Sequence, residues 1–152
     1  MNIKFVHTNL IAYDWEKLVT FYMKVFNCEP VYPERDMKGN WIEELTRIPD
    51  VHIKGIHLKL PGYKDGPTLE IFSYNKTYDR ENPPEINAPG FAHIAFHTDQ
   101  VEELLQRLID HGGEKYGEMV EKEIEGVGVL KVIYAKDPEG NIIEIQKWNK
   151  IK

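Results

Sequence analysis

The sequence contains a single cysteine, Cys28, among its 152 residues. One cysteine excludes a disulfide within the chain, and such sparse use of cysteine is typical of proteins from the reducing cytoplasm. No histidine lies near Cys28 in the sequence, so we interpret it as a structural residue near a helix end. The cysteine content therefore predicts a cytoplasmic protein.

Long apolar runs and clusters of basic residues are also missing from the sequence. The longest helical stretches carry a charge every few residues, which excludes a membrane-spanning segment. The opening MNIKFVHTNL lacks the basic and then apolar regions of a secretory signal. A formal net charge of −6 with no lysine and arginine cluster argues against binding to a nucleic-acid backbone. We therefore expect neither a membrane nor a nucleic-acid partner.

The overall composition is that of an ordinary globular protein. Hydrophobic residues make up 41% of the chain and charged residues 29%, which is close to the usual balance in soluble domains. A chain of 152 residues suits one domain, or two small modules that share a core. A small-molecule ligand is the partner class that remains.

One pattern of elements occurs twice along the chain. Asp14 can cap a helix whose apolar positions follow the helical period, and a second apolar stripe runs from Val101 to Ile109. A strand-like segment precedes each helix, at 3–10 and at 91–98. Further strand-like runs follow each helix, at 40–46, 54–61 and 67–74 in the first half and at 117–123, 128–136 and 141–148 in the second.

This repetition predicts an α+β fold made of two tandem βαβββ modules. The first module comprises residues 1–76 and the second residues 91–150, with a proline-containing linker at 77–90. The first and last strands of each module carry one aliphatic face, which suits coverage by a helix. We therefore expect a mixed sheet that forms an open cup, with the helices outside it.

The opposite face of these strands carries ionisable residues at repeated places. His7 and His93 lie in the first strand of each module, and Glu70 and Glu144 lie in the last. A face that mixes apolar residues with a few polar ones is typical of a ligand pocket. Burying two histidines and two glutamates without partners would cost folding free energy, and a divalent cation bound by them would offset this cost. The pattern predicts one metal ion bound by these four residues.

The remaining histidines are less informative. His97 shares the face of His93, so it is either a pocket residue or a hydrogen-bonding group near the strand end. We expect His52 and His57 to be solvated or in a loop. His111 follows a helix end, where a cation favours the helix dipole, and we assign it no catalytic role.

Four segments of the sequence resemble the vicinal oxygen chelate (VOC) superfamily, which includes glyoxalase I, bleomycin-resistance proteins and extradiol dioxygenases. They are FYMKVFNCEPV, TLEIFSYN, GFAHIAFHTDQVEELLQRL and DPEGNIIEI. The resemblance extends from about His7 to Trp148, implies a single VOC domain overall, and is closest in ligand pattern to glyoxalase I-like proteins. It implies a homodimer, since related proteins are commonly dimers, and a Zn, Ni, Co or Mn ion.

The resemblance implies a metal-dependent lyase or isomerase, similar to lactoylglutathione lyase, that acts on a small α-hydroxy or dicarbonyl compound through an enediolate. Glu144 would be the catalytic base and Glu70 its partner on the opposite side. Ile11 stands where bacterial glyoxalase I usually has an arginine that helps to hold glutathione, which argues against a glutathione conjugate. Glu70 stands where dioxygenases have a histidine, which argues against oxygen chemistry.

Two alternatives stay open at the level of the sequence. One is an epimerase similar to methylmalonyl-CoA epimerase, although Ala92 precedes His93 where such enzymes often have a second histidine. The other is a non-catalytic protein that binds a small molecule and confers resistance to it.

Overall fold

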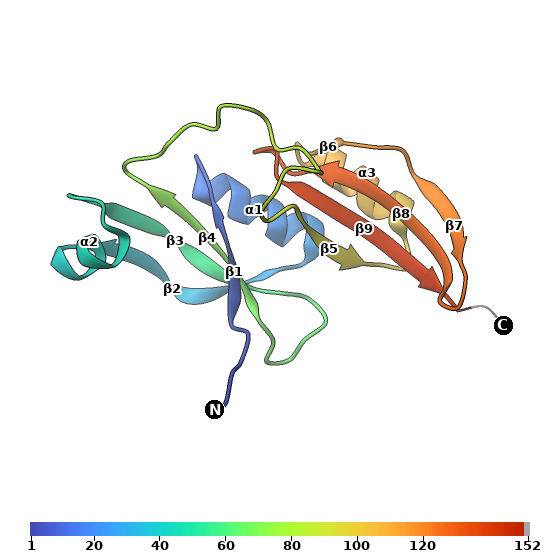
Figure 1. Ribbon diagram of the computed structural model, residues 1–152, viewed down its shortest axis with the longest axis horizontal. Coiled ribbons are helices and arrows are strands. Elements are labelled where there is room, and N and C mark those ends of the chain that lie inside the picture. Colours follow the sequence, from blue (N-terminus) through green and yellow to red (C-terminus); the bar gives the residue numbers. More distant parts are fainter. Residues whose placement is uncertain (151–152) are drawn as a thin grey trace. The chain divides into compact units, whose positions relative to one another are not determined.

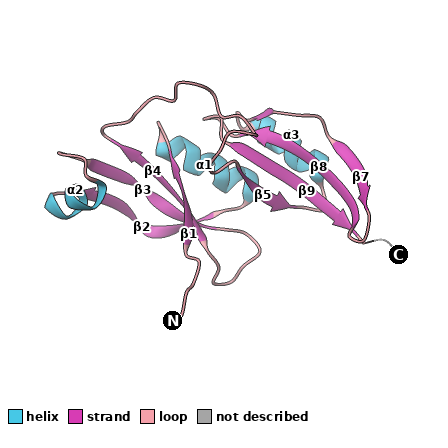
Figure 2. Cartoon of the chain, viewed as in Figure 1, coloured by secondary structure: helices cyan, strands magenta, loops and turns pink. Residues whose placement is uncertain are grey.

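The computed structural model describes residues 1–150, which form two compact units (Figure 1). The first unit comprises Met1–Asp79, and the second begins at Arg80. Strands make up most of the regular structure in both units (Figure 2). Each unit builds its own sheet and its own core, so each is described separately.

The first unit contains four strands and two helices. They are β1 (His7–Ile11), α1 (Trp15–Phe26), β2 (Glu29–Lys38), α2 (Asn40–Thr46), β3 (His52–Lys59) and β4 (Thr68–Tyr74). The strand order in the sheet is β1-β4-β3-β2. β1 is parallel to β4, and the other neighbouring strands are antiparallel.

The second unit has a five-stranded sheet and one helix. Its elements are β5 (His93–His97), α3 (Val101–Asp110), β6 (Glu114–Lys115), β7 (Val120–Ile124), β8 (Gly128–Lys136) and β9 (Ile142–Asn149). The order is β5-β9-β8-β6, with β7 also paired to β8, and β5 is parallel to β9. Two mixed sheets with few helices confirm the predicted α+β fold class. No helix within residues 1–150 is long and apolar enough to cross a membrane.

One face of each sheet is covered by a helix. Asp14 caps α1 by accepting a hydrogen bond from the Lys17 backbone N–H, at 3.1 Å between Oδ1 and N. α1 contacts β3 and β4, whose aliphatic residues on that side are fully buried, and α3 contacts β8 and β9 in the same way. These buried strand residues are Ile56, Leu58, Leu69 and Ile71 in the first unit and Ile133, Ile143 and Ile145 in the second. The opposite faces therefore carry the polar residues.

The strand predicted at 40–46 is wrong, because this segment is helix α2. The second strand of the first unit is instead β2, at Glu29–Lys38, which the sequence did not indicate. β2 contains Pro30 and Pro33 and is mostly exposed, so it lacks the apolar alternation that identifies a strand. It forms because it pairs with β3 along the sheet edge.

Helix α2 packs on part of the sheet face that carries Glu70. Ile42 from α2 is buried in a cluster with Val51, Ile53 and Phe72. Phe72 lies two residues after Glu70 in β4, and alternate residues of a strand point to the same face. The apolar cluster under α2 therefore adjoins the polar residues around Glu70.

Candidate metal centre

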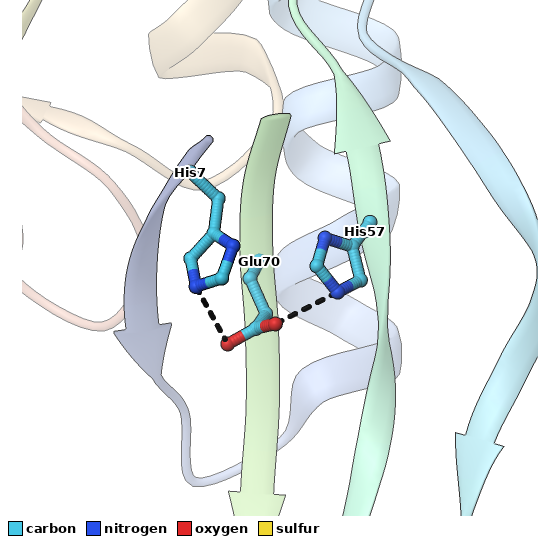
Figure 3. A group of neighbouring side chains, drawn as sticks. All are labelled: His7, His57 and Glu70. Atoms are coloured by element: carbon cyan, nitrogen blue, oxygen red, sulfur yellow. Dashed lines mark ion pairs between the residues drawn. The ribbon is translucent and has the colours of Figure 1, made fainter. Parts of the chain in front are cut away.

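Glu70 lies in the middle of β4, between side chains from both neighbouring strands. In the strand register it pairs with His57 of β3 and with Asn9 of β1. His7 begins β1, two residues before Asn9, so its side chain lies on the same face. Figure 3 shows His7 and His57 on the two sides of the Glu70 carboxylate, both directed toward it.

Both carboxylate oxygens of Glu70 have nitrogen neighbours. His57 Nε2 lies 2.7 Å from Glu70 Oε2, and Asn9 Nδ2 donates to Oε1 at 2.7 Å. His7 Nε2 is farther, at 3.7 Å from Oε1. The Glu70 side chain is only 13% exposed, whereas that of His7 is 38% exposed. Ligand atoms of His7, His57 and Glu70 all lie within 4.8 Å of one another.

The prediction that His52 and His57 are solvated or in a loop is wrong. Both belong to β3, and both side chains are half-buried and paired. His52 Nε2 lies 2.5 Å from Asp36 Oδ1. The sequence already indicated that His57 lies on the non-aliphatic face of its strand, because Ile56 and Leu58 lie on the other face. It did not indicate that His57 pairs with Glu70, so His57 was not predicted as a site residue.

Burial is the main influence on the charge of His57. It lowers the pKa of the imidazole, Glu70 opposes this effect, and Arg35 and His7 lower the pKa further. The neutral ring is therefore the main form at neutral pH. A neutral imidazole has one N–H donor and one acceptor nitrogen, so His57 can donate to the Glu70 carboxylate.

The second unit contains a corresponding pair. His93 Nε2 lies 3.1 Å from Glu144 Oε2, with the side chains 29% and 16% exposed. Tyr134 of β8 is the cross-strand partner of Glu144. Burial raises the pKa of the Tyr134 hydroxyl, and the charge of Glu144 and a hydrogen bond to it add to this shift.

The other histidines of the second unit do not join this pair. His97 is exposed at the end of β5, and its side chain makes no hydrogen bond or ion pair with any residue in 1–150. His111 caps the C-terminus of α3, where its Nδ1 lies 2.8 Å from the Arg107 carbonyl oxygen. The structure thus brings His7 to Glu70 and His93 to Glu144, each pair within its own unit.

The chemistry of these side chains fits a divalent transition-metal ion. Imidazole nitrogen and carboxylate oxygen are the ligands that Zn, Ni, Co and Mn accept in proteins, whereas Ca and Mg prefer oxygen alone. Ligand atoms about 2.1 Å from one ion are separated by roughly 3 to 3.5 Å, and the His7–Glu70 and His93–Glu144 contacts are 3.7 and 3.1 Å. Both pairs therefore have the composition of metal ligands; the His93–Glu144 contact also has the spacing, and the His7–Glu70 contact is slightly longer.

Comparison with known protein families identifies the superfamily to which this chain belongs. The family model of the Glyoxalase/Bleomycin resistance protein/Dioxygenase superfamily matches residues 4–145. A comparison with the curated proteins found no match.

Among solved structures, a glyoxalase family protein from Bacillus cereus is similar over 97% of this chain and 95% of its own, with a TM-score of 0.83 and 17% identity. The fosfomycin resistance protein FosX from Listeria monocytogenes is similar over 98% of this chain and 96% of its own, with a TM-score of 0.62 and 21% identity. A second FosX structure, which contains Mn(II) and a sulfate ion, covers 98% of this chain and 95% of its own, with a TM-score of 0.59 and 19% identity.

Proposed function

Because this chain belongs to the Glyoxalase/Bleomycin resistance protein/Dioxygenase superfamily, we propose that it is a metal-dependent lyase or isomerase of the glyoxalase type. Its substrate is a small α-hydroxy or dicarbonyl compound with two neighbouring oxygen atoms. The observation that carries the proposal is the repeated histidine–glutamate contact, one in each unit. The superfamily includes metalloenzymes, and the FosX structure with Mn(II) is one of them.

In this proposal His7, Glu70, His93 and Glu144 hold the ion, which is Zn, Ni, Co or Mn. When bound, the ion supplies Lewis-acid stabilisation of negative charge on the substrate oxygens. Glu144 would remove the proton from the hydroxyl-bearing carbon of an α-hydroxy carbonyl group, which leaves an enediolate, and would return it to the neighbouring oxygen-bearing carbon. Glu70 is the second catalytic carboxylate, the partner of Glu144.

Metal analysis combined with a substrate panel tests this function. The purified protein is expected to contain one divalent ion per chain. It should convert at least one compound from a panel of α-hydroxy acids, α-hydroxy ketones and dicarbonyls, assayed with and without glutathione. EDTA should stop the reaction, and Glu144→Gln should retain metal but lose turnover, since an amide is no base. His52→Gln, on the other face of β3, is the matched control and should stay active.

Three other results would contradict the proposal. Tight binding of a panel compound without turnover would favour a small-molecule binding or resistance protein, and racemisation of a chiral acid would favour an epimerase. Metal that stays at one ion per chain in the His7→Ala/His93→Ala variant would place the ion elsewhere.

We also propose a homodimer in the cytoplasm, an expectation that rests on related proteins and on the single cysteine. β1 and β5 each lie at a sheet edge, and exposed edges of this kind favour association with another chain. Light scattering at micromolar protein should give twice the monomer mass of 17.8 kDa, and a monomer across that range would contradict the dimer.

A further inference from the structure

The two glutamates of the proposed site have matching partners on one side. Glu70 lies opposite His57 in the antiparallel β3–β4 pair, and Glu144 lies opposite Tyr134 in the antiparallel β8–β9 pair. Each partner is a ring that hydrogen-bonds the carboxylate beside it. Each ring also meets the histidine of its own unit edge-on: the ring centres are 5.4 Å apart for His7 and His57 and 5.2 Å apart for His93 and Tyr134.

The two glutamates differ on the other side. In the parallel pairs, Asn9 lies opposite Glu70, whereas Ala95 lies opposite Glu144. The Asn9 amide donates a hydrogen bond to Glu70 Oε1, but the methyl group of Ala95 has no donor. Besides the histidine of its own unit, Glu70 therefore has a donor on each oxygen, from His57 and from Asn9. Besides His93, which lies 3.1 Å from its Oε2, Glu144 has Tyr134 as its one donor among the described residues.

The hydrogen-bond partners of His57 indicate which of its ring nitrogens carries the proton. An ionised carboxylate only accepts hydrogen bonds, so the 2.7 Å contact with Glu70 requires a proton on His57 Nε2. In the neutral ring Nδ1 is then an acceptor, and it lies 2.9 Å from the Thr68 hydroxyl oxygen, which can donate to it. Both ring nitrogens are thus used, and the ring is fixed between β4 residues that lie two positions apart.

We propose that His57 and Asn9 are positioning residues that fix the Glu70 carboxylate, and that Glu144, which has no counterpart of Asn9, is held less rigidly. This inference rests on the proposed function, because the two glutamates have separate tasks only in a site where one of them transfers a proton. The hydrogen-bond arrangement itself does not depend on a bound ion. The proposal predicts that His57 affects metal binding by holding Glu70 in place and does not bind the metal itself.

The first test uses the metal-free full-length protein and NMR. The ¹⁵N signals of the histidine side chains should show His57 as the Nε2–H tautomer at neutral pH. Relaxation of ¹³C-labelled glutamate side chains should show Glu70 to be more rigid than Glu144. Asn9→Ala should loosen Glu70, and Ala95→Asn, which adds the missing donor, should stiffen Glu144. A Nδ1–H tautomer, or equal mobility of the two glutamates, would overturn the proposal.

The second test measures the affinity of the same protein for Co(II) by competition with a chelator. Loss of a residue that orients a metal ligand typically weakens binding 10- to 100-fold, so we expect about this loss in His57→Leu. His57→Gln should recover most of the affinity, because its amide can donate to Glu70. His57→Tyr installs the partner that Glu144 has and should recover affinity as well. His52→Leu is the matched control on β3 and should bind Co(II) as the wild type does.

The outcomes separate this inference from the proposed function. If Co(II) binding is lost equally in His57→Leu and His57→Gln, together with a change in the visible spectrum that indicates one fewer nitrogen ligand, His57 is a ligand and the positioning role is wrong. If His57→Leu binds Co(II) normally, the positioning role is also wrong. If the wild type binds no divalent ion, the proposed function fails, and the NMR measurements still decide how Glu70 is held.

Discussion

His93 Nε2 lies 3.1 Å from Glu144 Oε2, although the residue opposite Glu144 in the parallel β5–β9 pair is Ala95. The same offset occurs in the first unit, where Asn9 is the strand partner of Glu70 and His7 lies two residues before Asn9. Residues two positions apart in a strand share a face, so the long side chain of each histidine reaches its glutamate diagonally. Each contact therefore depends only on the register of one parallel pair of strands.

Metal binding should stabilise the protein against heat. An ion that binds only the folded state adds about 2.7 kcal/mol to the free energy of unfolding when its concentration is 100 times the Kd. We expect Zn(II) or Co(II) to raise the Tm of the wild type, as measured by circular dichroism. The gain should disappear in His7→Ala/His93→Ala and persist in His52→Ala. An equal gain in all three proteins would exclude these histidines as ligands.

Gly55→Ala should strongly destabilise the first unit. An added Cβ at this position would lie 2.1 Å from the Ile71 carbonyl oxygen and 2.4 Å from Phe72 Cδ1. Forcing an extra carbon into such a packed place typically costs about 1–3 kcal/mol. Urea unfolding should show this loss in the free energy of unfolding. Gly117→Ala has no atom within 4 Å of the new carbon, so it is the control and should leave stability nearly unchanged.

Cys28 should be unreactive in the folded protein. Its side chain is buried, and burial raises the pKa of the thiol from 9.0 to about 12. Thiol reagents attack the thiolate, so labelling at pH 8 should require unfolding and should speed up in urea. Between pH 9 and 12 the unfolded chain loses this proton and the folded chain keeps it, so stability should fall as the pH rises.

The Cys28→Ala variant isolates that contribution. It should show a weaker fall in the free energy of unfolding between pH 9 and 11 than the wild type does. Identical slopes, or fast labelling of the folded wild type at pH 8, would show that the thiol is not buried in solution as it is in the structure.

His57 should contribute to the pH dependence of the metal-free protein on the acid side. Burial lowers its pKa below the ordinary value of 6.5, so just below pH 6.5 the unfolded chain binds more protons than the folded one. The free energy of unfolding should therefore rise with pH through this window. His57→Leu should flatten the slope in urea unfolding with EDTA present, and an unchanged slope would contradict the neutral, buried ring.

Much of the fold follows from patterns that are local in the sequence. The helical stripe after Asp14 predicts α1 with its correct cap, and the aliphatic alternation around Ile71 and Ile145 predicts β4 and β9 with the face that the helices cover. These features are predictable because periods of 2 and 3.6 residues record which side of an element is buried. The repeat of His and Glu in the first and last strands is equally visible in the sequence.

The tertiary structure decided what depends on pairing between distant segments. β2 has too little apolar alternation to be recognised, and it is a strand because β3 offers it a hydrogen-bonding edge. Segment 40–46 is a helix because Ile42 packs onto Phe72 and Ile53. The alternation in β3 already puts His57 on the non-aliphatic face. Only the register of the strands, however, places His57, Asn9 and Tyr134 beside Glu70 and Glu144. A hydrogen bond to a buried carboxylate joins residues far apart in the chain, so it is fixed by how the strands align and is absent from any local period.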